Sequence, residues 1–288
     1  MRVLITGRHG QVSRELQLSL AQHELLVLGH EQLDLADAAA IRRQVRELQP
    51  DLVINAAAHT AVDQAESEAA LAFAINATAP GVLAEEAAKL GVPLIHYSTD
   101  YVFDGAKDSS YRESDPTAPL GVYGQSKLAG EEAIRAVGGQ YLILRTSWVY
   151  SLHGKNFLLT MQRLLQEREE LRVVADQIGA PTWAGSIAQA TAQLVQHWQE
   201  GRTGSWGTYH LTGLGETSWF GFAEAIAAQL RAQGKPCARL LPIASSEYPT
   251  PARRPLNSRL DCSRLQQEWN VRLPDWHEAL LTCLSSPR

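Results

Sequence analysis

The sequence predicts an α/β fold: a doubly wound parallel sheet with helices on both faces and a smaller C-terminal lobe beside it. Three observations predict this fold. Short β-rich runs alternate with amphipathic helical stretches through the first half of the 288 residues. A glycine-containing turn joins the first of these strands to the first helix, and the alternation stops after Tyr150. Strands that recur with helices between them imply parallel pairing through right-handed crossovers.

The expected elements are short apolar runs and longer stretches with one apolar face. Strands are expected over residues 3–5, 25–28, 51–55, 92–97 and 141–144. Helices are expected over about 11–21, 38–48 and 69–90. Beyond Tyr150 we expect a helix over 157–170, a strand over 171–174, a helix over 185–199 and a glycine-rich stretch over 201–215.

Composition and charge argue against several classes of protein. The net charge of −5 does not favour broad nucleic-acid binding, because phosphate backbones require a concentrated basic face. The cysteines, Cys237, Cys262 and Cys283, are odd in number and lack metal-ligand spacing, so a reducing cytoplasm is expected rather than a disulfide framework. No apolar run approaches the length of a membrane span, and no signal peptide is expected.

The turn after the first strand, residues 6–13, contains Gly7 and Gly10. Glycine permits a tight turn and lets backbone N–H groups approach a pyrophosphate. Because this turn lies between an apolar strand and a helix, its position favours dinucleotide binding over a plain turn. It predicts the Rossmann layout, with a ligand crevice at the carboxyl ends of the strands. Ser13 stands at the third small position, where glycine is usual.

Two charged residues bear on the choice of cofactor. The second strand ends at Gly29 and His30, with Glu31 just beyond, rather than at the acidic residue that holds the ribose 2′-hydroxyl of NAD. Arg8, inside the glycine turn, suits a 2′-phosphate, which favours NADPH and leaves NADH as the alternative. The other interpretation of Arg8 is a solvated loop charge.

Tyr123 and Lys127 form the most informative local motif. Residues four apart share one face of a helix, and a nearby ammonium favours the phenolate, which lowers the tyrosine pKa toward the range of an acid–base catalyst. The spacing also occurs by chance as an exposed helix pair. Together with the upstream glycine turn, it predicts a catalytic pair in which the lysine also contacts the nicotinamide ribose.

Ser98, Thr99 and Asp100 follow the expected strand over 92–97. They would lie at the carboxyl end of the sheet, where hydroxyl groups suit polarisation of a substrate carbonyl beside Tyr123. The alternative is that Thr99 or Asp100 caps a turn. The sequence leaves the two interpretations even.

Longer blocks of the sequence resemble dTDP-4-dehydrorhamnose reductases, a family of the extended short-chain dehydrogenase/reductase superfamily. The blocks occur in order and span residues 55–63, 96–105, 123–127, 145–150, 176–182 and 251–260. The resemblance runs nearly end to end. It implies reduction of the 4-keto group of dTDP-4-dehydro-L-rhamnose to dTDP-L-rhamnose, the last step in making that sugar donor.

The resemblance also implies residue roles. Tyr123 would donate the proton, Lys127 would support it and contact the cofactor, and Thr99 would position the tyrosine. Asp100 and Trp148 would face the sugar nucleotide. Besides Gly7 and Arg8, the cofactor contacts would come from Gly10, Gln11 and Val12 at the phosphates, Asp34 and Leu35 at the adenine, and Ala58, His59 and Thr60 along the sheet edge.

The chain is expected to form two unequal parts. A Rossmann domain that binds NAD(P) would span 1–149 and about 171–207, and a substrate-binding lobe would span about 150–170 and 208–288. In that lobe, Arg253, Arg254 and Asn257 lie in a proline-rich segment and are assigned to the substrate, because guanidinium groups suit a diphosphate. The alternative for this cluster is a solvated basic loop.

Some members of the family dimerise around magnesium held by acidic side chains, one of them in the helix after Thr182. Here that helix begins Trp183-Ala184-Gly185 without a carboxylate, and Glu15 alone is a poor Mg²⁺ site. We therefore predict no metal site, and either a monomer or a homodimer.

Two other interpretations stay open. A sugar-nucleotide epimerase or dehydratase shares the scaffold but recycles its bound NAD, so stoichiometric cofactor consumption would exclude it. A non-catalytic regulatory subunit, such as the beta subunit of methionine adenosyltransferase, also resembles this family. A stoichiometric enzyme partner in a pull-down would favour that interpretation.

Overall fold

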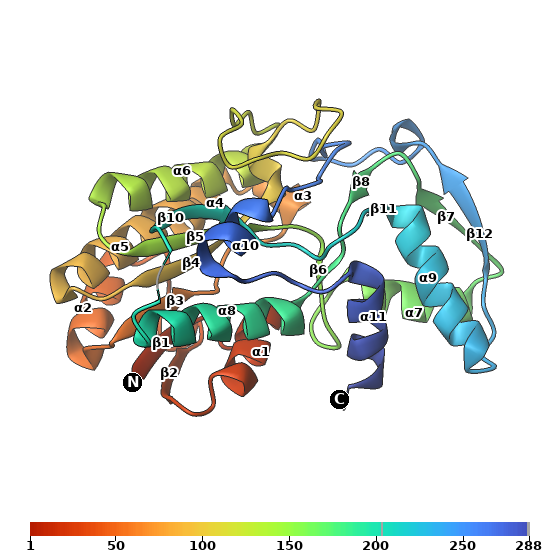
Figure 1. Cartoon of the computed structure of the whole chain (residues 1–288). Helices are drawn as coiled ribbons and strands as arrows, with labels where there is room; N and C mark the ends of the chain where they lie inside the picture. The colour runs from red at the N-terminus through yellow and green to blue at the C-terminus, as the bar shows by residue number, and fades with distance from the viewer. Residues whose placement is uncertain (203, 287–288) are drawn as a thin grey trace.

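A computed structural model of the chain describes residues 1–202 and 204–286 (Figure 1). Its centre is a parallel sheet of six strands in the order β10-β5-β4-β3-β1-β2. The strands are β1 (Arg2–Thr6), β2 (Glu24–Leu28), β3 (Leu52–Asn55), β4 (Leu94–Thr99), β5 (Tyr141–Thr146) and β10 (Gly207–His210). The doubly wound α/β fold predicted from the sequence is confirmed.

The alternation of side chains along β1 explains how the sheet buries both faces. Val3 and Ile5 point into one core and Leu4 points into the opposite one, and all three are fully buried. Figure 1 shows the helical layers on either side of the sheet. The covering helices are α1 (Gln11–Ser19) and α8 (Ala184–Gln199) on one face, and α2 (Ala38–Leu48), α5 (Ala79–Leu90) and α6 (Val122–Val137) on the other.

The helix expected over 69–90 contains a π-helical turn. α4 (Ala69–Phe73) runs into η1 (Ala74–Thr78) and then into α5. The side chain of Asn76 in η1 accepts from the N–H of His59 at 2.8 Å and donates to its carbonyl at 3.0 Å. It also donates to the Ser126 hydroxyl at 3.1 Å. Such turns are frequent at functional sites, and this one ties the loop after β3 to α6.

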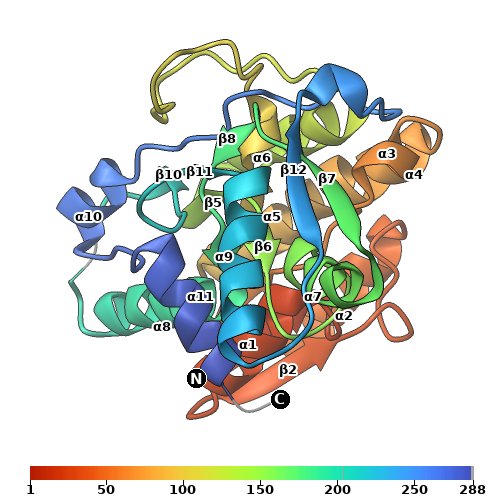
Figure 2. The same cartoon turned by 90° about the vertical axis from the view of Figure 1, so that its right-hand side faces the viewer.

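The smaller lobe has a core of its own. Leu158, Phe222 and Leu280 meet there and are fully buried. They come from α7 (Phe157–Glu167), α9 (Trp219–Ala232) and α11 (Trp276–Ser285). These helices accompany a parallel pair, β7 (Glu170–Val174) and β12 (Arg239–Ile243), which Figure 2 shows side by side. Two shorter pairs are β6 (Val149–Tyr150) with β9 (Thr182–Trp183), and β8 (Ile178–Gly179) with β11 (Thr217–Ser218).

Three segments pack against the other part of the molecule from the one to which the predicted domain boundaries assign them. Residues 171–174 form a strand as expected, but β7 pairs with β12, and Val173 lies in the core of the smaller lobe. Residues 207–210 form β10 beside β5 at the edge of the central sheet. Trp269 of α10 (Ser263–Trp269) packs in the core beneath that sheet. A short apolar run does not encode its pairing partner, so we propose moving β7 to the smaller lobe, and β10 and α10 to the Rossmann part.

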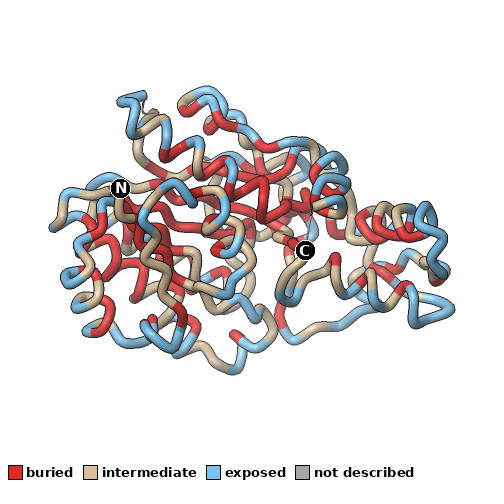
Figure 3. The backbone as a smooth tube through the Cα atoms, turned by 90° about the horizontal axis from the view of Figure 1, so that it is seen from below, coloured by how far each residue is buried: buried red, intermediate tan, exposed pale blue. Residues whose placement is uncertain are grey.

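Burial follows this architecture. Figure 3 shows the buried backbone gathered along the central sheet and inside the smaller lobe, with exposed turns at the periphery. Among the helices of residues 1–202 and 204–286, none is both long and apolar enough to cross a membrane.

Candidate active site

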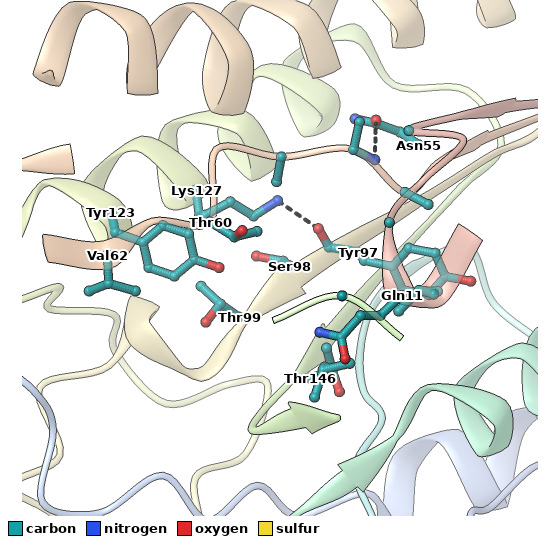
Figure 4. A pocket seen from close by; sticks show the side chains of 18 of the residues that line it. Gln11, Asn55, Thr60, Val62, Tyr97, Ser98, Thr99, Tyr123, Lys127 and Thr146 are labelled. Atoms are coloured by element: carbon teal, nitrogen blue, oxygen red, sulfur yellow. Dashed lines mark hydrogen bonds between the residues drawn. The ribbon is translucent and has the colours of Figure 1, made fainter. Parts of the chain in front are cut away.

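A cavity of about 700 Å³ opens at the carboxyl ends of β1, β3, β4 and β5 (Figure 4). The turn after each of these strands contributes to its lining. β2 lies on one side of β1, and β3, the next strand along the chain, lies on the other side. The strand order therefore reverses at β1. In open α/β sheets, ligands bind at such a reversal.

The turn after β1 leaves space and donors for phosphates. Gly7 has φ +83°, and a Cβ there would lie 3.0 Å from Cα of Ala57, so a side chain would be both strained and crowded. α1 begins directly after Gly10, which has no side chain to cap the N–H groups of the first turn. Gly10, Gln11 and Val12 all line the cavity. The N-terminus of α1 therefore presents donors and a positive dipole end to an anion.

Arg8 lines the same cavity and is held on two sides. Its Nη2 donates to the carbonyl of Val27 at 2.6 Å, and its Nη1 lies 3.4 Å from the carboxylate of Glu31. One guanidinium nitrogen is therefore held by the protein, although the Arg8 side chain is 37% exposed. The arrangement keeps a cation at the glycine turn, with the acid that follows β2 beside it.

A smaller cavity of about 170 Å³ adjoins the glycine turn. Asp34 and Leu35 line it, together with the apolar side chains of Leu28, Leu33 and Ile75. An apolar slot with a carboxylate at its edge suits a purine ring and its exocyclic donors. The structure thus brings Asp34 and Leu35 to a place that fits their predicted role.

The three residues after β3 that were predicted to contact the cofactor differ in where they lie. Ala58 and Thr60 line the large cavity. The ring of His59 turns instead to Glu68, with Nε2 3.2 Å from Oε2. His59 is therefore held by both Glu68 and Asn76, and its ring is not in the lining of the large cavity.

Tyr123 and Lys127 both line the cavity from α6. Burial raises the pKa of Tyr123 to about 12, against a smaller lowering by the Thr99 hydroxyl. Burial lowers the pKa of Lys127 to about 8, and its Nζ donates to the carbonyl of Tyr97 at 2.6 Å. The expectation of a lowered Tyr123 pKa is wrong in this structure, because burial raises that pKa and Lys127 is not among the groups that shift it. In Figure 4 the phenol points toward Thr99 and Ser98.

Thr99, the last residue of β4, caps the turn that follows and also lies at the cavity. Its hydroxyl accepts from the N–H of Tyr101 at 3.1 Å, as a cap does, while Thr99 also lines the cavity. It donates to Asp100 Oδ1 at 3.0 Å. Asp100 is buried, and among the described residues its Oδ2 has no hydrogen-bond partner. The Ser98 hydroxyl donates to Glu131 at 2.6 Å and is therefore committed to the framework behind the cavity.

Trp148 forms the side of the cavity next to the smaller lobe. Its ring stacks on Trp219 with centroids 3.7 Å apart and planes 13° from parallel. Its φ of +49° is strained for a tryptophan. A Cβ at Gly179 would lie 2.7 Å from the indole, so only glycine lets the ring lie there. Strain of this kind is typical of ligand sites.

Arg253, Arg254 and Asn257 lie outside the lining of this cavity. Arg253 is exposed, whereas Arg254 makes a paired contact with Asp63, Nη2 to Oδ2 at 2.9 Å and Nη1 to Oδ1 at 3.1 Å. Asn257 is buried, and its Nδ2 donates to the carbonyls of Lys107 and Ser109 at 2.6 and 2.8 Å. This amide has no free donor for a substrate, so its contacts support a role in holding the loop.

Comparison with known proteins agrees with this geometry. The family model described as "RmlD substrate binding domain" matches residues 1–288. A dTDP-4-dehydrorhamnose reductase of Burkholderia thailandensis is 49% identical over 99% of this chain and 98% of its own length. That of Escherichia coli is 44% identical over 96% of this chain and 94% of its own.

The chain belongs to the dTDP-4-dehydrorhamnose reductase family. The resemblance found in the sequence is thereby confirmed. The crystal structure of the reductase of Bacillus anthracis in complex with NADP superposes with a TM-score of 0.90 and 36% identity, covering 98% of both chains.

Sequence reasoning missed a loop that connects the glycine turn of this reductase-family chain to the smaller lobe. Gln11 Oε1 accepts from the Ser151 hydroxyl at 3.0 Å and from Asn156 Nδ2 at 2.8 Å. Between these two residues, Gly154 and Lys155 line the large cavity. A lysine flanked by Gly154 and Asn156 was the only available signal, and it is too common to assign alone.

Glu15, the one acidic residue considered as a magnesium ligand, does not line the large cavity. Glu15 lines a second cavity of about 630 Å³ with His153 and Cys283. Burial raises the pKa of Glu15, which disfavours the charged form that a hard cation requires. Within the described part of the chain, no three His, Cys, Asp or Glu side chains gather as metal ligands.

Proposed function

We propose that this protein reduces the 4-keto group of dTDP-4-dehydro-L-rhamnose to give dTDP-L-rhamnose, with NADPH as reductant and Tyr123 as proton donor. The observation that carries the proposal is that the Tyr123 phenol, Lys127 and the glycine turn line one cavity; burial, which raises the pKa of Tyr123, favours its protonated form. The reductases of this sugar that are 44% and 49% identical support the choice of substrate.

The residues present fit a dinucleotide cofactor. The crowded Gly7, the uncapped start of α1 and the apolar slot beside Leu35 offer places for its phosphates and adenine. Arg8 supports NADPH over NADH, because a guanidinium suits a 2′-phosphate, and the B. anthracis relative is in complex with NADP. Bound there, the reduced nicotinamide supplies a hydride to the sugar.

The side chains of α6 and β4 supply the proton. As the 4-keto carbon accepts the hydride, its carbonyl π bond opens and the oxygen takes the proton from Tyr123, which becomes a phenolate. Thr99 would position the Tyr123 hydroxyl, and its own side chain is fixed by contacts with Tyr101 and Asp100. Lys127 lies with Tyr123 in the lining of the same cavity, where it would contact the bound cofactor.

The proposed substrate contacts come from the part of the cavity that is not assigned to the cofactor. We assign the sugar nucleotide to the side of the cavity formed by Trp148 and Asp100, whose Oδ2 has no protein partner in the described residues. We assign Arg253 and Arg254 to the diphosphate, because both carry guanidinium groups on the adjoining loop. Ser98 and Asn257 contribute by holding that framework. The protein would act in the cytoplasm, as a monomer or a homodimer.

The test is cofactor oxidation by purified protein supplied with NADPH, NADH and dTDP-4-dehydro-L-rhamnose. Tyr123→Phe should lower turnover roughly a hundredfold to ten-thousandfold while cofactor binding stays intact. Tyr101→Phe is the matched control, since its ring lies 5.4 Å from that of Tyr123 and carries the same phenol. Unchanged turnover in Tyr123→Phe would exclude this proton donor.

The same assay separates the two alternatives. An epimerase or dehydratase would convert its sugar nucleotide without net cofactor loss, and a regulatory subunit would consume none and would copurify with an enzyme. The reductase relatives described above do not favour either alternative. Steady loss of NADPH that depends on the keto sugar would exclude both.

A further inference from the structure

The side chain of Gln11, the first residue of α1, is held by the loop that begins the smaller lobe. Its Oε1 accepts from Asn156 Nδ2 at 2.8 Å and from the Ser151 hydroxyl at 3.0 Å. Gln11 lines the large cavity, whereas Asn156 does not and lies directly before α7. The glycine turn and the smaller lobe therefore meet through two side-chain amides, and the orientation of these amides decides which atom of Gln11 is presented to the cavity.

The amide of Asn156 is oriented by three backbone groups. The N–H of Leu159 in the first turn of α7 points at Oδ1 at 3.0 Å, and an N–H can only donate. The carbonyls of Ser151 and His153 lie 2.9 and 3.1 Å from Nδ2, and a carbonyl can only accept. Reversal of the amide would place donor against donor or acceptor against acceptor at all three contacts. Asn156 therefore presents a donor, Nδ2, to Gln11.

This donor orients the amide of Gln11 in turn. Oε1 faces Asn156, because the NH₂ group of Gln11 would otherwise meet another NH₂ group. The Ser151 hydroxyl accepts from the N–H of His153 at 3.0 Å and shares its own proton between the carbonyl of His153 and Oε1. Both contacts from the loop therefore fall on Oε1, and Nε2 is the atom of the Gln11 amide that is left for other partners.

The Nε2 of Gln11 is a donor at the cavity. Of the described residues, only Ser151 and Asn156 hydrogen-bond to this amide, both at Oε1, and Nε2 stays accessible. Figure 4 shows the amide among the side chains that line the cavity. Gln11 also begins α1, whose uncapped first turn suits phosphate groups. An NH₂ group beside them would donate to phosphate oxygens, whereas an amide oxygen in its place would repel them.

We propose that Asn156 is a positioning residue for the cofactor: it orients the Gln11 amide so that Nε2 donates to the diphosphate of the bound dinucleotide. The same Asn156 side chain caps α7, so the first turn of the smaller lobe determines which group the cavity presents beside the glycine turn. The inference rests on the proposed function only in its ligand, a nicotinamide dinucleotide, and does not require the keto sugar as substrate.

The first experiment reverses the donor at residue 156 and measures binding to the cofactor-free protein by calorimetry. Asn156→Asp keeps an oxygen for the Leu159 N–H but offers Gln11 an acceptor, so the Gln11 amide should turn its oxygen to the cavity. The Kd for NADPH should rise about tenfold or more, because a donor to a charged group is lost. The Kd for adenosine 2′-monophosphate, which carries no 5′-phosphate, should stay at the wild-type value.

A double-mutant cycle separates this role from a purely structural one. Gln11→Ala removes the amide through which Asn156 is proposed to act. With both titrations at high salt, where the charge added at residue 156 is screened, Asn156→Asp should change the Kd for NADPH by less than about twofold in the Gln11→Ala protein. The same large rise in both backgrounds would overturn the proposal, because Asn156 would then act through the shape of the loop. So would a wild-type Kd for NADPH in Asn156→Asp alone.

Gln11→Glu tests the donor without changing the loop, and decides the matter alone if Asn156→Asp does not fold. One carboxylate oxygen can accept from Asn156 and Ser151 as Oε1 does, and the other replaces Nε2. The Kd for NADPH should rise about tenfold or more, and wild-type affinity in this variant would overturn the proposal. No sugar is present in these titrations, so a failure of the proposed reduction would leave their results unaffected.

Discussion

Two buried carboxylates near the cavity, those of Glu131 and Asp100, have opposite surroundings. Glu131 is fully buried, and its oxygens accept from Arg145 Nε at 2.8 Å, from Arg145 Nη2 at 2.6 Å and from Ser98 at 2.6 Å. Asp100 is 3% exposed, accepts from Thr99 through Oδ1, and within the described residues its Oδ2 has no partner.

The contrast shows in the acidities of the two groups. Burial opposes ionisation of Glu131, but the hydrogen bonds and charge of Arg145, with Ser98 and Arg135, hold its pKa below the usual value. Burial raises the pKa of Asp100 to about 6, because neighbouring hydroxyl groups oppose it only in part. Protein cations thus neutralise the carboxylate of Glu131, whereas the carboxylate of Asp100 has no such partner and its ionisation costs stability.

The largest effect should come from breaking the paired site. Glu131→Gln leaves the Arg145 guanidinium buried without its carboxylate, which should lower the free energy of unfolding by about 3–5 kcal/mol. The matched control is Glu86→Gln, which removes another buried carboxylate whose cations are far more exposed than Arg145: Arg46 and Lys89 are 57% and 56% exposed, and Arg42 is 33% exposed. Denaturant unfolding of the two variants measures the difference.

Equal losses in these two variants would contradict the comparison, because they would show that burial of the carboxylate decides the effect and not burial of its partner. A smaller loss in Glu86→Gln is expected, since water can solvate the released cations.

The unpaired site should behave in the opposite way. Asp100 has a raised pKa in the folded protein, so its contribution is fully favourable below the unfolded pKa, near 4, and is lost as pH rises through about 6. Asp100→Asn should therefore gain about 1–3 kcal/mol relative to wild type between these pH values, while turnover falls because the substrate loses a contact. Unfolding measured from pH 4 to pH 7 in both proteins tests the sign; a constant difference would contradict it.

The sequence predicts the fold and brings out the proposed catalytic pair, because each depends on local pattern. Apolar runs separated by helices specify a parallel sheet. Gly7 indicates a tight turn, in which a side chain would be strained and crowded. The spacing of Tyr123 and Lys127 reports one face of a helix. These local patterns do not depend on contacts between distant segments. In the structure, Gly7, Tyr123 and Lys127 line one cavity.

The remaining features depend on contacts between distant segments. The pairing of β7 with β12, and the amide of Asn257 across residues 107–109, join positions that sequence spacing does not relate. The direction of the Tyr123 pKa shift was predicted wrongly, because the spacing of Tyr123 and Lys127 does not report the burial that raises this pKa. The contacts of His96 with Asn55 and of Asn55 with Thr6 likewise join residues of three different strands.

A third carboxylate sharpens the comparison, since Asp63 is paired like Glu131 but lies near the surface. Its side chain is 41% exposed and that of Arg254 is 25% exposed. Asp63→Asn should therefore change the free energy of unfolding by less than about 1 kcal/mol. If Arg254 contacts the substrate diphosphate, Arg254→Gln should raise the KM of the sugar nucleotide about tenfold or more, because a charge-assisted hydrogen bond is lost.

The two variants of this pair should move the KM in opposite directions. Asp63→Asn releases the guanidinium from its carboxylate and should lower the KM. A similar rise in both variants would show that the pair acts as one structural unit, as Glu131 and Arg145 do. Steady-state kinetics with varied sugar nucleotide measures both.

The smallest effect is expected at Lys155, an exposed cation beside the glycine turn. Gln11 holds the loop that carries it, through Ser151 and Asn156, so its charge is placed near the proposed phosphate site without being buried. Lys155→Met should raise the KM for NADPH about threefold at low salt, and less at high salt because exposed charges are screened. Lys155→Arg should keep the wild-type value. A KM that does not depend on salt or on this charge would leave α1 and Arg8 as the cofactor's anion site, and would place the loop's role in the contact with Gln11.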